Sequence, residues 1–293
     1  MKEYNKLFKK EITEDGSVTF YSEEFDENFH SKYGAKKESE ITYIQGCKIV
    51  EKLQSKSSVK ILDVCFGLGY NAASALEIYQ KIKPSSHLEI IALEIDEDVI
   101  QQTINHNLLS FWSQETKEVL TFLAEHKTFI NQSYSLQLII DDARISLEKL
   151  VNQKYQFDAI FLDPFSPPKC PQLWTVEFFG LLSKCLANDG IIATYSCAAA
   201  VRKAMQLNGL NIASNEAVGG RAPGTIASFY PLPPLSLKEL EQLETKASVP
   251  YRDTDLRGRA PSILKQRENE QKNSSLESTG KWKKRWSKSN KVY

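Results

Sequence analysis

Residues 59–72 read VKILDVCFGLGYNA, and their pattern is the strongest indication of the fold class. It begins as a short apolar run, which ends in an acid at Asp63, and it continues into a loop that contains Gly67 and Gly69. The spacing of apolar residues after the loop predicts a helix over 71–82. A strand, a glycine loop and a helix in this order are typical of the first unit of an α/β fold.

The same alternation continues along the chain. Apolar runs at 88–93, 136–140, 157–162 and 190–195 are separated by stretches that predict helices. Such runs indicate parallel strands covered by helices on both faces. Residues 211–218 and 225–230 predict an antiparallel closing pair. The fold class is therefore α/β, a doubly wound, Rossmann-like sheet of mostly parallel strands. The expected helices are 41–53, 96–105, 116–129, a helix from about 146, 171–186, 197–207 and 237–246.

Both ends of the chain differ from this central part. Residues 11–22 read EITEDGSVTFYS, in which a turn at Asp15-Gly16 and the alternation after it predict a β-hairpin. The aromatic-rich segment 23–40 is expected to form a lid. We therefore divide the chain into an N-terminal hairpin and lid (1–54), a central domain (55–261) and a tail (262–293).

The charge is distributed unevenly, although 37 basic and 37 acidic residues give a net charge of zero. The tail has nine Lys or Arg and three Glu, a net charge of +6, so the rest of the chain is acidic. Because the tail is polar and has few apolar residues, it is expected to be disordered. Its KWKKRW stretch at 281–286 indicates an arm that binds RNA, with basic groups on phosphates and Trp rings on bases. The alternative is a solvated tail that contributes only solubility.

Composition excludes several classes of protein. Hydrophobic residues make up 41% of the chain, which suits a globular protein, and no apolar run approaches the roughly 18 residues of a membrane span. Residues 1–10 lack the apolar core of a signal peptide. The five cysteines and four histidines form no zinc-type cluster. We expect a cytoplasmic protein with reduced thiols, no metal and no membrane segment.

Acidic residues stand at the carboxyl ends of the first four expected strands. They are Asp63, Glu94, Asp142 and Asp163. Ligands of open parallel sheets bind beyond these strand ends, so the four carboxylates predict acceptors for ribose hydroxyls, an exocyclic amine or an ammonium group. The alternative for Asp142 and Asp96 is a role as helix N-caps.

The glycine loop alone also fits the dinucleotide pattern G-x-G-x-x-A, because Gly67, Gly69 and Ala72 have that spacing. Asp63 argues against a dinucleotide, since its charge would repel a pyrophosphate and would suit a cationic amino-acid group. The glycines allow a ligand to approach the backbone closely.

Residues 163–174 read DPFSPPKCPQLW, and their prolines predict a rigid loop after the fourth strand. Amino-group methyltransferases often have an acid or amide, a proline and an aromatic residue at this place, which Asp163, Pro164 and Phe165 resemble. There the acid and a carbonyl accept hydrogen bonds from the attacking amine, while the aromatic ring stacks on a base or packs beside the methyl donor. The alternative is a proline-rich turn with a buried Phe165.

Taken together, these motifs resemble the MnmC methyltransferase-domain family over about residues 15–251. The resemblance implies a class I S-adenosylmethionine-dependent fold and N-methylation of 5-aminomethyl-(2-thio)uridine at the wobble position of tRNA. Its basis is Gly16-Ser17-Val18-Thr19, Tyr21-Ser22, His30-Ser31, Gly34-Ala35, Glu38-Ser39, the glycine loop, 163–174, Ala193-Thr194-Tyr195, Val201-Arg202 and Gly219-Gly220-Arg221.

The resemblance also implies roles for individual residues. Asp63 would meet the ammonium group of S-adenosylmethionine, Glu94 its ribose hydroxyls and Asp142 its adenine amine. The cofactor-binding set is Asp63, Phe66, Gly67, Gly69, Asn71, Glu94 and Asp142, and the catalytic set is Asp163, Pro164 and Phe165. The substrate-binding set is Tyr21, Glu38, Lys169, Trp174, Arg202 and Arg221.

Two residues depart from the family pattern, since Cys65 and Pro164 stand where glycine is usual. The chain has no second glycine fingerprint for the flavin domain of bifunctional relatives, so we expect methyl transfer to tRNA without flavin. One alternative is an aminoalkyl transferase like spermidine synthase, or a small-molecule amine methyltransferase, which shares the sheet and its acids. Another is a non-catalytic RNA-binding module.

Overall fold

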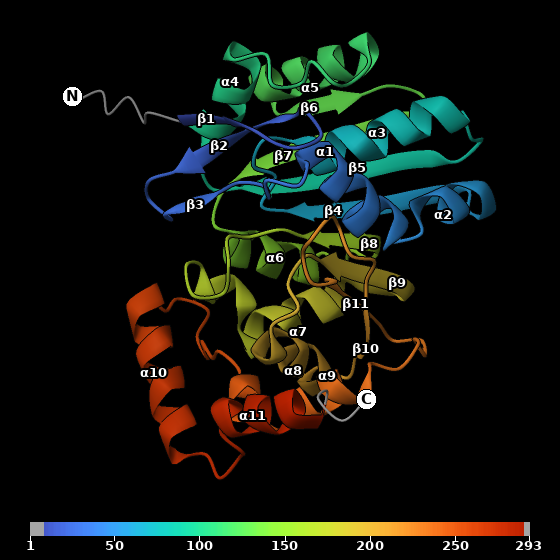
Figure 1. The fold of residues 1–293 in the computed structure, drawn as a ribbon. Helices are drawn as coiled ribbons and strands as arrows, with labels where there is room; N and C mark the ends of the chain where they lie inside the picture. The colour runs from blue at the N-terminus through green and yellow to red at the C-terminus, as the bar shows by residue number, and fades with distance from the viewer. Residues whose placement is uncertain (1–8, 290–293) are drawn as a thin grey trace.

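An eight-stranded sheet forms the centre of the computed structural model, which describes residues 9–289 (Figure 1). The strand order is β10-β11-β9-β8-β4-β5-β7-β6. The five central strands are parallel, while β6, β10 and β11 pair antiparallel with their neighbours, so the predicted α/β class and the closing pair are confirmed. The strands are β4 (Ser58–Val64), β5 (His87–Glu94), β6 (Thr128–Ile130), β7 (Tyr134–Ile140), β8 (Phe157–Leu162), β9 (Leu186–Thr194), β10 (Asn211–Ser214) and β11 (Thr225–Ser228).

Helices cover both faces of the sheet, each over its own apolar core (Figure 1). Successive side chains of a strand point to opposite faces, so Ile61 of β4 packs in one core and Leu62 in the other. This explains why the central strands are apolar throughout. The first face has α2 (Ile49–Ser55), α3 (Tyr70–Ile82), α4 (Glu97–Asn105) and α5 (Gln114–His126); the second has α6 (Ala143–Asn152), α7 (Val176–Cys185) and α8 (Ala199–Leu207).

The N-terminal segment forms a separate small antiparallel sheet of β1 (Lys9–Ile12), β2 (Val18–Ser22) and β3 (Glu27–Asn28), which we call the cap together with the turns between its strands. The predicted hairpin is confirmed. The Asp15 carboxylate accepts a hydrogen bond from the Ser17 backbone N–H at 3.0 Å, and this bond holds the turn. A short helix α1 (Ala35–Glu38) and a π-helical turn (Ser39–Gln45) connect the cap to α2.

Several of the predicted helices have different boundaries; the one predicted over 237–246, for example, is the shorter α9 (Leu237–Gln242). The helix predicted over 41–53 is interrupted at Lys48, where φ is +54°. The one predicted over 116–129 ends at His126, and Thr128–Ile130 form β6, because β-branched and aromatic residues favour strands. The one predicted over 171–186 splits into a 3-10 turn (Pro171–Trp174) and α7, which Thr175 caps.

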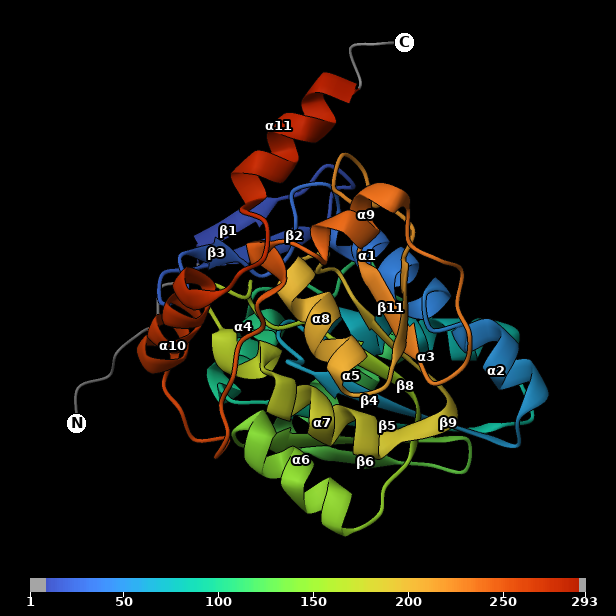
Figure 2. The same ribbon diagram turned by 90° about the horizontal axis from the view of Figure 1, so that it is seen from below.

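The prediction of a disordered tail is wrong for its described part. The chain forms α10 (Ala260–Asn273) and α11 (Thr279–Ser289), which lie beside the main domain (Figures 1 and 2). Ile263 and Trp282 are buried, and the Arg267 guanidinium lies 4.4 Å from the centre of the Tyr251 ring. A few anchoring side chains therefore order a segment whose average composition is that of a disordered one. Residues 290–293 lie outside the described part, and the division of the chain into three units stays a prediction.

Candidate active site

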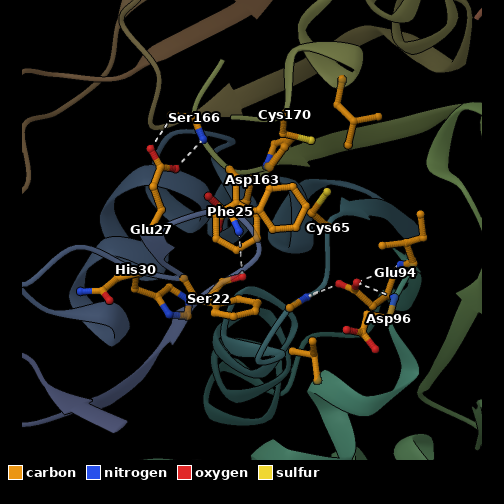
Figure 3. A pocket seen from close by; sticks show the side chains of 18 of the residues that line it. Ser22, Phe25, Glu27, His30, Cys65, Glu94, Asp96, Asp163, Ser166 and Cys170 are labelled. Atoms are coloured by element: carbon orange, nitrogen blue, oxygen red, sulfur yellow. Dashed lines mark hydrogen bonds between the residues drawn. The ribbon is translucent and has the colours of Figure 1, made fainter. Parts of the chain in front are cut away.

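A cavity of about 980 Å³ opens at the carboxyl ends of the central strands, between the sheet and the cap (Figure 3). Its size is typical of a small-molecule site. The predicted site residues in its wall are Tyr21, Glu38, Gly67, Glu94, Asp142, Asp163, Pro164, Phe165 and Arg221.

The glycine loop reaches into this cavity at Gly67. The backbone N–H groups of Cys65 and Phe66 both donate to the Leu93 carbonyl, at 3.0 and 2.9 Å, so the loop bends around the end of β5. Gly67 has φ +54° and Gly69 has φ +79°, and a Cβ on Gly69 would stand 2.9 Å from the Phe66 ring. Cys65 also has a left-handed backbone, with φ +67°, a conformation that glycine adopts more readily than cysteine.

Glu94 lies at the end of β5 with both carboxylate oxygens engaged. It accepts hydrogen bonds from the backbone N–H groups of Gly67 (2.8 Å), Ile95 (2.8 Å) and Asp96 (3.0 Å). Burial raises the pKa of Glu94, whereas these three donors oppose that shift. The carboxylate is therefore held in one orientation, toward the cavity (Figure 3).

Asp163 lies at the end of β8 and faces the cavity. The Asn71 side-chain amide donates to its carboxylate at 3.0 Å. Burial, and then the negative charge of Glu38, raise the pKa of Asp163 to about 6, while Tyr43, Asn71 and Arg221 lower it. Asp163 is therefore a carboxylate at neutral pH and can accept a hydrogen bond from an amine.

Comparisons with known proteins show which family the chain resembles. Residues 104–229 match a family described as S-adenosyl-L-methionine-dependent methyltransferase. An uncharacterized protein of Methanocaldococcus jannaschii is 31% identical over 268 residues, which are 87% of this chain and 70% of that protein. The crystal structure of MNMC2 from Aquifex aeolicus has 30% sequence identity and a TM-score of 0.81, over 93% of this chain and 87% of that one.

The chain belongs to the MnmC-like family of S-adenosylmethionine-dependent methyltransferases. A further relative is the tRNA 5-methylaminomethyl-2-thiouridine biosynthesis bifunctional protein MnmC of Azoarcus sp., which is 27% identical over 218 residues. These residues are 72% of this chain but 34% of that protein, so the chain spans about a third of this bifunctional relative.

S-adenosylmethionine is the cofactor of this methyltransferase, and the cavity fits it. Carboxylates in the wall suit hydroxyl and amine donors, and the apolar side chains of Leu93, Ile95 and Val99 suit the adenine ring. A Cβ on Gly67 would stand 3.4 Å from the Phe29 ring and 3.8 Å from the Cys65 carbonyl oxygen, and its absence lets a ligand approach the Gly67 backbone. When bound, the cofactor supplies a methyl group already activated on a sulfonium.

Two acids of the methyltransferase have a second role as helix caps. Asp96 caps α4 and Asp142 caps α6, so the N-cap alternative is correct for both, although both also line the cavity. Asp142 forms an ion pair with Arg144 at 2.7 Å, and Arg144 also pairs with Asp253 at 3.0 Å. The bonds from Arg144 lower the pKa of Asp142 against the effect of burial.

Several predicted cofactor residues of the methyltransferase lie behind the wall of the cavity. Asp63 is fully buried, and burial and the nearby Asp163 charge raise its pKa well above the usual value. The predicted contact of Asp63 with the cofactor's ammonium group stays a prediction. Three others, Phe66, Gly69 and Asn71, likewise do not line the cavity and lie behind the residues that do.

Two residues predicted to bind substrate are instead buried in the protein. Trp174 is fully buried, and its indole N–H donates to the Phe165 carbonyl at 2.9 Å, so it supports the proline loop. Arg202 is 2% exposed and pairs with Glu239 at 2.9 Å. The position of a basic or aromatic residue in a motif does not reveal whether packing will bury it, and neither side chain is available to tRNA here.

The other predicted substrate residues are Tyr21, Glu38 and Arg221, which line the cavity, and Lys169, whose side chain is more exposed. Arg221 forms an ion pair with Glu38, and its guanidinium lies 5.0 Å from the centre of the Tyr195 ring. Lys169 is outside the wall of the cavity and pairs with Asp26 at 3.0 Å. Glu38 and Arg221 therefore neutralise each other in the wall, close to Asp163.

Sequence reasoning missed several residues of the wall. Most come from the segment predicted to be a lid. The aromatic content of that segment indicated a role for the segment as a whole, but it did not identify single residues of the wall. The missed residues include Phe25, Glu27, Phe29, His30, Cys65, Cys170 and Tyr195.

Within residues 9–289, no group of three or more His, Cys, Asp or Glu is arranged to hold a metal ion, and no helix is long and apolar enough to cross a membrane.

Proposed function

We propose that this methyltransferase transfers the methyl group of S-adenosylmethionine to the aminomethyl nitrogen of 5-aminomethyl-(2-thio)uridine at the wobble position of tRNA. The observation that supports it most is the Asp163 carboxylate, which shares one cavity with Pro164, Phe165 and Glu94. The relatives named for tRNA 5-methylaminomethyl-2-thiouridine biosynthesis suggest the acceptor. The proposal includes a cytoplasmic location and a reaction without flavin.

In this proposal, alignment is the main catalytic task of the chain. Asp163 accepts a hydrogen bond from the neutral amine and directs its lone pair toward the methyl carbon. The new N–CH₃ bond forms as the S–CH₃ bond breaks, and the positive charge moves from sulfur to nitrogen. The Asp163 carboxylate stabilises that charge and can receive the proton that the product ammonium loses. One face of the Phe165 ring stacks on Phe25, so the base would contact its other face.

The direct test is transfer of labelled methyl groups into total tRNA that lacks this modification, followed by nucleoside analysis. The expected product is methylated 5-aminomethyl-(2-thio)uridine, and tRNA with an unmodified wobble uridine is the control. A labelled polyamine or small amine as the only product would support the small-molecule alternatives. Retention on immobilised tRNA with no transfer would support the RNA-binding module.

The rate of methyl transfer is expected to depend on the ionisation of Asp163, whose pKa is about 6. Below pH 6 the carboxyl becomes protonated and no longer accepts from the amine, and the amine itself also holds a proton. A plot of log kcat/KM against pH, at saturating cofactor, should therefore have a slope of about 2 below pH 6 and about 1 above it. A constant slope through pH 6 would contradict the role of Asp163.

We also propose that α11 contacts tRNA phosphates through its exposed lysines, Lys281, Lys283 and Lys284. The two Trp rings of α11 have a different role from the base stacking that the sequence predicts. Trp282 is buried, and the Trp286 indole N–H donates to Glu241 at 2.9 Å, so both anchor the helix. This favours an ordered basic surface over a flexible arm.

Changing all three lysines to alanine should raise KM for tRNA about tenfold and leave cofactor affinity unchanged. The slope of log K against log salt for tRNA binding should flatten by roughly 2 to 3, because up to three phosphates lose their partners. The matched control replaces three exposed lysines at or just after the C-terminal ends of α3, α6 and α7, namely Lys83, Lys154 and Lys184. Equal salt slopes for the two triple variants would remove this role from α11.

A further inference from the structure

Glu27 of the cap holds the loop that follows Asp163. Its carboxylate accepts hydrogen bonds from the backbone N–H of Ser166, at 2.9 Å, and from the Ser166 hydroxyl (Figure 3). The two residues are 139 positions apart in the chain, and both line the cavity. A charged acceptor with two donors on one residue is among the stronger hydrogen-bonding arrangements in proteins.

The rest of this loop is held from the opposite side. The Tyr195 hydroxyl donates to the Pro164 carbonyl at 2.8 Å, and the Trp174 indole N–H donates to the Phe165 carbonyl at 2.9 Å. These bonds fix the carbonyls of the loop to the main domain. Glu27 of the cap accepts a hydrogen bond from the next backbone N–H of the loop, that of Ser166. The loop is therefore held between the cap and the main domain.

Two further contacts connect the cap to the loop. The Phe25 ring stacks on the Phe165 ring, with ring centres 4.2 Å apart and planes 12° from parallel. Asp26 pairs with Lys169 at 3.0 Å, but the Asp26 side chain is 72% exposed. Exposed ion pairs contribute little to stability, about 0–1 kcal/mol. Glu27 is therefore the cap residue that bonds to the main chain of the loop.

We propose that Glu27 is a positioning residue, which holds the Asp163–Ser166 loop in its productive geometry from the cap. This inference rests on the proposed function, because Asp163 is the group that Glu27 would position. A shift of about 1 Å in a reacting group can lower a rate by about a hundredfold. The acceptor site is then complete only when the cap is closed on the loop.

The kinetic test compares Glu27→Ala, Glu27→Gln and Asp26→Ala. Glu27→Ala should lower kcat about 10- to 30-fold and change the Kd for S-adenosylmethionine less than about twofold, because the loop stays held on its other side. Glu27→Gln should recover most of the rate, since the amide oxygen still accepts from the Ser166 N–H. Asp26→Ala is the matched control: it removes the ion pair with Lys169 and the hydrogen bond from the Tyr21 hydroxyl but no bond to the main chain of the loop, so kcat should stay within about twofold of the wild type.

Amide hydrogen exchange gives a readout that does not depend on catalysis. The Ser166 amide should exchange faster in Glu27→Ala than in Asp26→Ala, while amides of β8 remain equally protected, which also shows that the variant is folded. If wild-type protein fails to methylate tRNA but Ser166 exchanges faster, the proposed function fails while the hold of Glu27 on the loop stands. Equal Ser166 exchange in the two variants, or equal kcat, would overturn the inference.

Discussion

Asp163→Ala is expected to lower kcat by about 100-fold or more, which is the usual contribution of a positioned acid or base. The carboxylate accepts from the Asn71 amide at 3.0 Å and faces the cavity, so its loss removes the acceptor that would align the amine. The affinity for S-adenosylmethionine, measured by calorimetry, should fall less than kcat, because the cofactor-facing acids remain in place.

The matched control for this variant is Asp158→Asn, on the same strand. Asp158 lies near the start of β8, pairs with Lys56 and accepts from the Lys60 backbone N–H at 2.8 Å. Its replacement should lower thermal stability and leave kcat close to that of the wild type. Turnover in Asp163→Ala equal to that in Asp158→Asn would remove Asp163 from the reaction.

Glu94→Gln is expected to weaken binding of S-adenosylmethionine by about 1–3 kcal/mol, or roughly 5- to 150-fold in Kd, the usual cost of losing a charged hydrogen bond. The structure favours the upper part of this range. Three backbone N–H groups point at the two carboxylate oxygens, so the NH₂ group of glutamine would face a donor at one of these positions. The substitution is therefore expected to disturb the glycine loop as well as the predicted ribose contact.

Calorimetry with Glu97→Gln as the control separates this effect from a general loss of charge. Glu97 lies three residues later, in the first turn of α4, and pairs with Lys127 on the surface at 2.6 Å. That variant should bind the cofactor as tightly as the wild type. Unchanged affinity in Glu94→Gln would refute the predicted contact of Glu94 with the ribose.

The sheet and its acidic edge could be predicted from the sequence because both depend on local patterns. Each central strand is a short apolar run, and the acid that ends it must lie at the carboxyl edge of a parallel sheet. Glu94 and Asp163 follow directly from this argument and line the cavity. The same argument left open whether Asp142 caps a helix instead. In the structure, Asp142 is the N-cap residue of α6 and also lines the cavity.

Contacts between distant segments could not be predicted in this way. Arg202 and Arg221 both lie in motifs that indicated substrate binding, yet one is buried by β10, β11 and α9, while the other reaches the cavity. Glu27 and Ser166 meet only because the cap folds over the sheet. The order of the tail depends on single anchors such as Trp282, which average composition does not reveal.

The bridge from Asp142 through Arg144 to Asp253 matters for the design of shorter fragments of this enzyme. Arg144 also donates to the Gly258 carbonyl at 2.9 Å, and Asp253 accepts from the Gly258 backbone N–H at 2.8 Å. The Arg144 side chain is 12% exposed in the full chain, and a fragment that stops at the last strand of the sheet would leave its guanidinium with Asp142 alone, at the edge of the cofactor cavity. The smallest fragment that preserves this edge therefore extends through Gly258, about thirty residues past the end of β11 at Ser228.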